Sequence, residues 1–91
     1  MTPRDGDGAT GARILALLRE VTGEDEVVND LDVELHESGL LDSLGIVTLL
    51  VSLEETFGLV ISPSELDRAA WATPRRLVAD VEHRLTTAGA A

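Results

Sequence analysis

Asp42 and Ser43 are the residues of this chain whose types and spacing favour chemistry. They stand immediately before a long helical pattern, where the carboxylate of Asp42 can accept hydrogen bonds from the first free backbone N–H groups. The hydroxyl of Ser43 is then left uncommitted, beside exposed N–H donors and the positive end of the helix macrodipole. A phosphodiester built on that oxygen would be favourably placed. The plainer alternative is that both residues only start the helix.

The helical pattern that follows, from Ser43 to Phe57, has two apolar faces. At about 100° per residue, one side forms a core face of five apolar residues. These are Ile46, Leu49, Leu50, Leu53 and Phe57. Nearly opposite lie Leu44, Val47 and Val51. Because so small a domain buries only one face of a helix, we expect the second face to be a docking surface for partners. The alternative is that a neighbouring loop covers it.

The chain offers no catalytic set around this serine. A nucleophilic triad of Ser43 with His36 or His83 would need an elbow between a strand and a helix, and the sequence predicts neither a Gly-x-Ser-x-Gly motif nor a sheet. Two separated histidines and no cysteine give no metal-ligand spacing. We therefore predict no catalytic and no metal-binding residues. A displayed serine without such partners is typical of a protein that other enzymes modify.

Composition narrows the possible partners. The formal net charge is −10 over 91 residues, which argues against binding to nucleic acid or anionic membranes, because both need clustered basic residues. Basic partner surfaces are the natural complement. No apolar run is long enough to span a membrane, the N-terminus lacks the apolar core of a signal peptide, and no cysteine marks an oxidising compartment. We expect a cytoplasmic monomer that does not insert into membranes.

Helical segments are predicted on both sides of the site. A first helix is expected from about Gly11 to Thr22, with Thr10 as its cap and Gly23 as its stop. The connection from Gly23 to Leu41 has no clean period but many apolar side chains. This composition predicts an ordered loop that lies over the core.

The second half of the chain carries two further start signals. Ser62 is expected to cap a short third helix with Pro63 at its first position, and this helix is expected to end near Trp71. Thr73 and Pro74 repeat the signal for the last helix. The pattern predicts an all-α fold, a small four-helix bundle with a long loop between helices 1 and 2 and a short third helix. The predicted domain spans residues 10–85, between disordered tails at 1–9 and 86–91.

Asp42-Ser43-Leu44, after a long loop and at the start of a long helix, resembles the phosphopantetheine attachment site of acyl and peptidyl carrier proteins. Longer stretches are similar to D-alanyl carrier proteins and to other discrete aminoacyl carriers. These stretches are Gly39–Val47, Glu55–Gly58 and Leu66–Pro74. The similarity covers about residues 39–82. The Asp-Arg-x-x-Trp-x-Thr-Pro segment that begins at Asp67 adds most to its specificity.

The resemblance implies a bundle of the acyl-carrier-protein type in which Ser43 receives 4'-phosphopantetheine from coenzyme A through a phosphopantetheinyl transferase. Asp42 would cap the helix beside the site. The thiol of the arm would hold an amino acid or acyl group as a thioester. An adenylating aminoacyl ligase would supply this cargo, and a downstream acyl- or aminoacyl-transferring enzyme would take it. Fatty-acid carriers have acidic residues after the serine, whereas here Leu44, Val47 and Val51 imply apolar recognition of partners.

We therefore expect a discrete, non-catalytic aminoacyl or peptidyl carrier protein of a peptide or polyketide antibiotic pathway. The alternative within this class is a D-alanyl carrier protein for teichoic acid D-alanylation. The alternative from another class is an unmodified helical protein-interaction domain, in which Asp42 and Ser43 only cap the helix.

Overall fold

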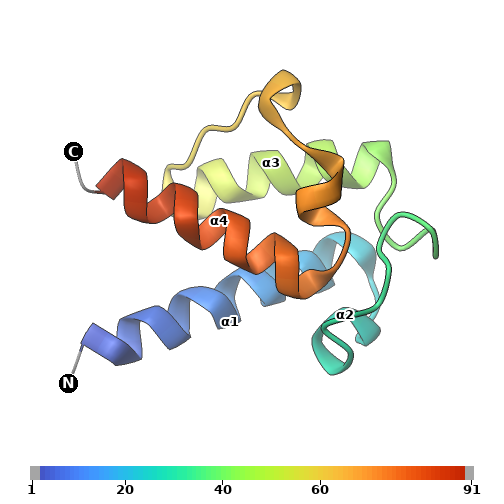
Figure 1. The fold of residues 1–91 in the computed structure, drawn as a ribbon, viewed down its shortest axis with the longest axis horizontal. Helices are drawn as coiled ribbons and strands as arrows, with labels where there is room; N and C mark the ends of the chain where they lie inside the picture. The colour runs from blue at the N-terminus through green and yellow to red at the C-terminus, as the bar shows by residue number, and fades with distance from the viewer. Residues whose placement is uncertain (1–2, 90–91) are drawn as a thin grey trace.

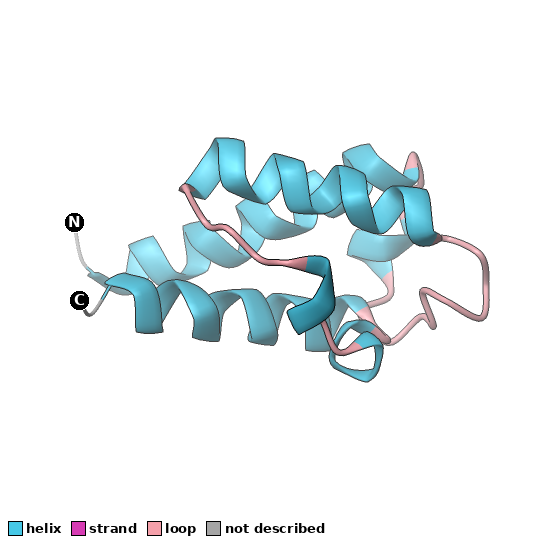
Figure 2. Ribbon diagram, turned by 90° about the horizontal axis from the view of Figure 1, so that it is seen from above, coloured by secondary structure: helices cyan, strands magenta, loops and turns pink. Residues whose placement is uncertain are grey.

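Three long helices and three short helical turns make up the fold. The computed structural model describes residues 3–89, with side chains from residue 10 to 87, and contains no strand in that range (Figures 1 and 2). The elements are α1 (Pro3–Thr22), α2 (Glu26–Asn29), α3 (Ser43–Phe57), the 3-10 turns η1 (Pro63–Glu65) and η2 (Arg68–Trp71), and α4 (Pro74–Gly89). Helix α1 packs against α2, α3 and α4, and η2 packs against α4. The predicted all-α fold class is confirmed.

The outer helices are longer than the sequence predicted. Helix α1 begins at Pro3 rather than near Gly11, so Thr10 lies inside the helix and does not cap it. A proline is tolerated at the first helical position because its missing N–H would have no partner there. Helix α4 continues to Gly89, since no proline or glycine interrupts it earlier. Residues 3–9 and 86–89, which were expected to be tails, are thus helical. Residues 1–2 and 90–91 of those tails lie outside the described residues. The domain limits at residues 10 and 85 stay predictions.

The connection between α1 and α3 is an ordered loop, as predicted, with the short α2 inside it. Val27, Leu35 and Leu41 are buried. The backbone N–H of Leu35 donates to the carbonyl of Ala72 at 2.8 Å, so the loop is tied to the end of η2. This fixes the segment that leads into α3.

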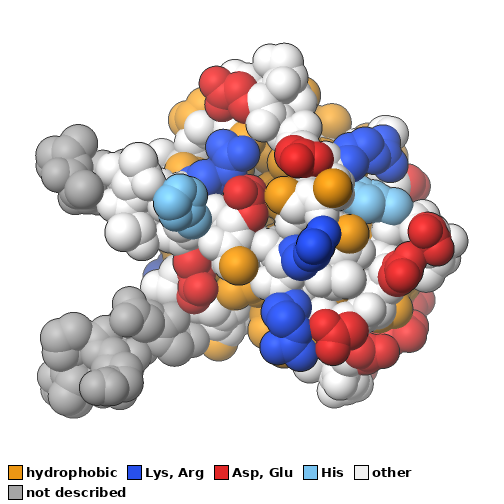
Figure 3. Space-filling view, viewed as in Figure 1, with side chains coloured by type: hydrophobic (Ala, Val, Ile, Leu, Met, Phe, Trp, Pro, Cys, Tyr) orange, Lys and Arg blue, Asp and Glu red, His pale blue; other side chains and the backbone are white. Residues whose placement is uncertain are grey.

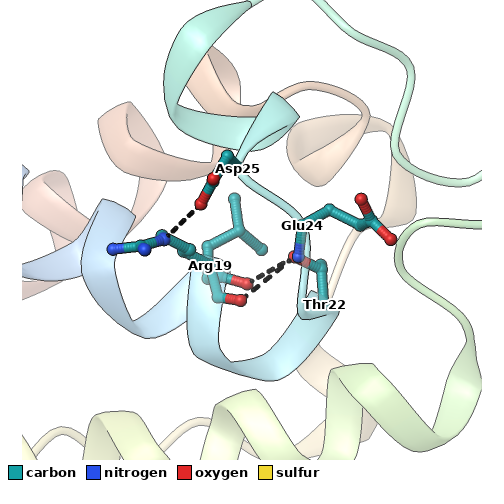
Figure 4. A network of polar contacts seen from close by, with 5 residues as sticks. Arg19, Thr22, Glu24 and Asp25 are labelled. Carbon is teal, nitrogen blue, oxygen red and sulfur yellow. Dashed lines mark hydrogen bonds and ion pairs between the residues drawn. The ribbon is translucent and has the colours of Figure 1, made fainter.

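Local polar contacts hold the exit from α1 (Figure 4). The guanidinium of Arg19 pairs with Asp25. The hydroxyl of Thr22 donates to the carbonyl of Leu18 at 2.9 Å and accepts from the N–H of Glu24 at 3.3 Å. These contacts lie where the chain turns from α1 into α2.

The prediction of one short third helix is wrong. The segment instead forms two 3-10 turns, η1 and η2, and Leu66 and Asp67 between them have an extended backbone. The side chain of Ser62 makes no capping hydrogen bond. Instead the carboxylate of Asp67 accepts from the N–H of Ala69 at 2.9 Å, a local bond that competes with continuation of the helix. Leu66 packs against the core, which the extended backbone allows.

One apolar core joins the four α-helices, η2 and the connecting segments. Its buried side chains are Ile14, Leu18, Val27, Leu35, Leu41, Ile46, Leu49, Leu50, Leu53, Leu59, Ile61, Trp71, Leu77 and Val81. Trp71 is fully buried, and its indole N–H donates to Asp80 at 2.8 Å. Within the described part of the chain, no buried side-chain nitrogen or oxygen lacks a partner. No described helix is long and apolar enough to cross a membrane.

Candidate functional site

Helix α3 begins at Ser43 because Asp42 caps it, as predicted. The backbone of Asp42 is extended, and its carboxylate accepts from the N–H of Gly45 at 2.7 Å. A Cβ atom on Gly45 would lie 3.1 Å from Leu41 Cδ1 and 3.3 Å from Asp42 Oδ1. The absence of a side chain therefore lets the cap close tightly. No local sequence pattern indicates this role of Gly45, because the proximity arises only from the folded loop.

Ser43 is the first residue of α3, and its side chain is exposed. Among the described residues its hydroxyl takes part in no hydrogen bond. The nearby carboxylate of Asp42 is committed to the helix cap. The start of α3 also lies at the end of the molecule away from the free ends of α1 and α4 (Figure 1). The hydroxyl is thus uncommitted and accessible.

An open pocket of about 300 Å³ lies beside Ser43. Ser43, Ile46 and Val47 line it from α3. Pro63, Leu66 and Arg68 line it from the strap, which we define as residues 58–73 between α3 and α4. The sequence analysis did not place these strap residues at the site. The Asp-Arg-x-x-Trp-x-Thr-Pro motif that begins at Asp67 marks this segment in the sequence. Its spacing from Ser43 does not show that the segment folds against α3.

The predicted second face of α3 is exposed. Leu44 is 74% exposed, Val47 50% and Val51 49%, so no described loop covers them. On the opposite face, Leu49 and Leu53 are fully buried. The helical pattern therefore assigned both faces correctly. We refer to Leu44, Val47 and Val51 below as the α3 stripe.

His36 connects the loop before α3 with η2. Its Nδ1 lies 3.4 Å from the carbonyl oxygen of Leu41, and its Nε2 lies 3.2 Å from that of Arg68. It is a hydrogen-bonded structural residue. His83 is exposed on α4. Neither histidine makes a hydrogen bond with Ser43, and the described residues contain no cluster that could hold a metal ion.

Charged side chains of both signs, with apolar ones between them, are spread over the face of the molecule that Figure 3 shows. In the loop before α3, a hydrogen bond with Glu37 and the charge of that residue raise the pKa of Glu34. Further from the site, Arg75 donates to both oxygens of Asp32, at 3.0 and 3.3 Å. These hydrogen bonds and the charge of the guanidinium lower the pKa of Asp32.

Comparisons with known proteins cover the whole of this site. Residues 12–81 match a family model described as a phosphopantetheine attachment site. The chain is 46% identical to a D-alanyl carrier protein of Enterococcus faecalis over 69 residues, 76% of this chain and 88% of that protein. It is 45% identical to a D-alanyl carrier protein of Lacticaseibacillus casei over 76 residues, 84% of this chain and 94% of that protein. A D-alanyl carrier protein of Listeria monocytogenes is 41% identical over 69 residues.

Proposed function

Because this chain belongs to the family of carrier proteins with a phosphopantetheine attachment site, we propose that Ser43 holds the arm and that the cargo is a D-alanyl thioester. Carriers of this family bear 4'-phosphopantetheine covalently and are themselves not enzymes. The observation that carries the proposal for Ser43 is its uncommitted, exposed hydroxyl at the capped start of α3. The cargo is taken from the names of the relatives.

The residues around Ser43 fit such a group. The pocket beside it has apolar walls at Ile46, Val47 and Leu66, and it opens to solvent. Its one charged lining residue is the cation Arg68. The described residues therefore provide an attachment oxygen, an apolar surface and a positive charge, which suit an arm that combines a phosphodiester with an aliphatic segment.

In the attachment step, Ser43 Oγ forms a bond to phosphorus while the pyrophosphate bond of coenzyme A breaks, releasing 3',5'-ADP. The serine proton passes to solvent or to a base of the transferase. Asp42 holds the first turn of α3 in place through Gly45, so the backbone that carries the attacking oxygen is held in place. The attached group supplies a terminal thiol that can hold an acyl group as a thioester.

We further propose that the α3 stripe binds the partner enzymes. These are a phosphopantetheinyl transferase, an adenylating aminoacyl ligase and an enzyme that removes the aminoacyl group. The stripe begins one residue after Ser43, and each of its side chains is at least 49% exposed. An apolar patch beside a reactive position is typical of a docking surface. The net charge of −10 favours partners with basic residues around their apolar contact.

The cargo proposal differs from the first expectation. The names of the relatives given above agree with the alternative of a D-alanyl carrier and do not mention an antibiotic pathway. We therefore propose D-alanine as the cargo. Loading of an amino acid other than D-alanine in the test below would instead favour the antibiotic pathway.

The test is intact mass after co-expression with a broad-specificity phosphopantetheinyl transferase. We expect a gain of one phosphopantetheinyl group in the wild-type protein and none in Ser43→Ala. The holo protein is then incubated with a D-alanine-adenylating ligase, ATP and either D-alanine or L-alanine. Selective loading of D-alanine supports the proposal, and selective loading of another amino acid by its own ligase would contradict it. An unchanged wild-type mass would favour the unmodified interaction domain.

A further inference from the structure

We propose that Arg68 is a positioning residue that pairs with the phosphodiester of the arm. The inference rests on the proposed attachment at Ser43. Arg68 lines the pocket that Ser43 also lines, and it comes from the strap rather than from α3. Attachment of the arm adds one negative charge at Ser43, in the pocket that Arg68 also lines.

The other arginines with described side chains all have partners. Among residues 10–87, Arg68 is the arginine whose guanidinium makes no hydrogen bond, ion pair or ring contact. The partners of the others are Asp25 for Arg19, Asp32 for Arg75, Asp80 for Arg84, the carbonyl of Ala69 for Arg76 and the ring of Phe57 for Arg13. An arginine whose guanidinium has none of these partners is available for an added anion.

Nearby carboxylates do not take this role. Glu34 and Glu37 line a second shallow pocket together with Arg68, yet they interact with each other, which raises the pKa of Glu34. Asp67, the residue before Arg68, caps η2 through Ala69. Among the described residues, the guanidinium of Arg68 forms no ion pair with any of these carboxylates.

The backbone of Arg68 is fixed although its side chain is free. Its carbonyl oxygen lies 3.2 Å from His36 Nε2, and η2 begins at this residue under the Asp67 cap. The side chain thus extends from an anchored position. A guanidinium presents several N–H groups in a planar fork that matches two phosphate oxygens. Pairing would hold the base of the arm against the apolar wall of the pocket.

NMR of ¹⁵N-labelled apo and holo protein tests this pairing, with intact mass to prove attachment. At low salt, we expect attachment to shift the Nε–Hε signal of Arg68 but not that of Arg13. In about 1 M salt, where the screening length falls to about 3 Å, the shift should largely vanish. In the holo protein the ³¹P signal should change with salt in the wild type and much less in Arg68→Gln. Arg68→Lys should restore part of that response.

Arg13→Gln is the matched control, because it removes the same charge near Phe57, about 21 Å along α3 from Ser43. It should leave the ³¹P response unchanged. If the mass rises but the Arg68 signal and the ³¹P response are insensitive to attachment and to Arg68→Gln, the pairing is wrong while attachment stands. If Arg13→Gln acts like Arg68→Gln, the effect is one of net charge, and the pairing is also wrong. No mass gain would overturn the attachment and the pairing together.

Discussion

Asp42 and Ser43 are adjacent, but they have different roles at the start of α3. Replacing Asp42 with alanine removes the acceptor for the N–H of Gly45 and should lower the free energy of unfolding by about 1 kcal/mol. Ser43→Ala removes only an exposed hydroxyl and should change it by no more than about 0.5 kcal/mol. Urea denaturation of both variants measures this difference. If Ser43→Ala costs as much as Asp42→Ala, the hydroxyl is structural.

Trp71 depends on a single acceptor for its buried N–H. Asp80→Ala leaves the indole N–H unsatisfied and should cost about 1 to 3 kcal/mol of unfolding free energy. Asp80→Asn keeps an acceptor oxygen, although it weakens the ion pair with Arg84, and should cost clearly less. Thermal denaturation of the two variants compares them. Equal losses would mean that the charge of Asp80, and not its hydrogen bond with Trp71, stabilises the fold.

At the scale of the element, the two faces of α3 should respond oppositely to substitution. Leu53 is fully buried, so Leu53→Ala should cost about 2 to 5 kcal/mol of stability. Val47 is 50% exposed, so Val47→Asp should cost little stability. It should instead slow aminoacyl loading about tenfold or more, because one apolar contact in a docked interface contributes roughly 1 to 2 kcal/mol.

Melting temperature and loading rate, measured on both variants, separate these effects. Val51→Asp serves as a second exposed substitution on the α3 stripe. Unfolding of Val47→Asp as severe as that of Leu53→Ala would remove the argument for a docking surface. Normal loading by both aspartate variants would show that partners bind elsewhere.

The contrast between α3 and the strap shows which elements a sequence can predict. Helix α3 was predicted at its observed bounds, because a cap at Asp42, a stop at Gly58 and a periodic core face are all local signals. The third helix was not, because its interruption depends on Leu66 reaching the core and on a side-chain bond of Asp67. The contact of Leu66 with the core exists only once the strap is packed against the bundle.

At the scale of the whole molecule, electrostatic repulsion should make stability depend on salt. Seventeen acidic residues stand against seven arginines. Modest salt should therefore raise the melting temperature by screening, with the steepest rise at low ionic strength. Differential scanning calorimetry over a range of NaCl concentrations measures this. A melting temperature that falls steadily as salt is added would show that attractive ion pairs dominate.

The acid side of the stability curve should reflect the pair of Asp32 with Arg75. Hydrogen bonding to Arg75, and then its charge, lower the pKa of Asp32 from 3.8 in the folded state. The stabilisation is therefore present above that ordinary pKa and is lost as pH falls through the lower folded value. Asp32→Asn should lower the melting temperature at pH 7, and the difference from wild type should shrink in acid.

Glu34→Gln is the opposite control, because Glu37 raises the pKa of Glu34 in the folded state. Folding disfavours the ionised carboxylate of Glu34 and so lowers the free energy of unfolding at neutral pH. This destabilisation disappears as pH falls through the raised pKa of Glu34. The variant should thus melt at or above the wild-type temperature at pH 7. A lower melting temperature there would mean that Glu34 is stabilised by a contact other than Glu37.

The site as a whole could be predicted only in part. Ser43, its cap and the α3 stripe follow from one continuous segment, and the sequence analysis found them. The pocket wall at Pro63, Leu66 and Arg68 comes from residues twenty or more positions further along the chain. It depends on how the strap returns across α3, which no local period encodes.

The start of α3 lies opposite the free ends of α1 and α4, which point the same way (Figure 1). A bead, an affinity tag or a fused protein joined beyond Pro3 or Gly89 would therefore stand on the far side of the bundle from Ser43. The protein immobilised through either end should accept its arm and its cargo as fast as it does in free solution. The protein can therefore be attached to a support at the end that holds the free ends of α1 and α4 while it is loaded with cargo at the opposite end.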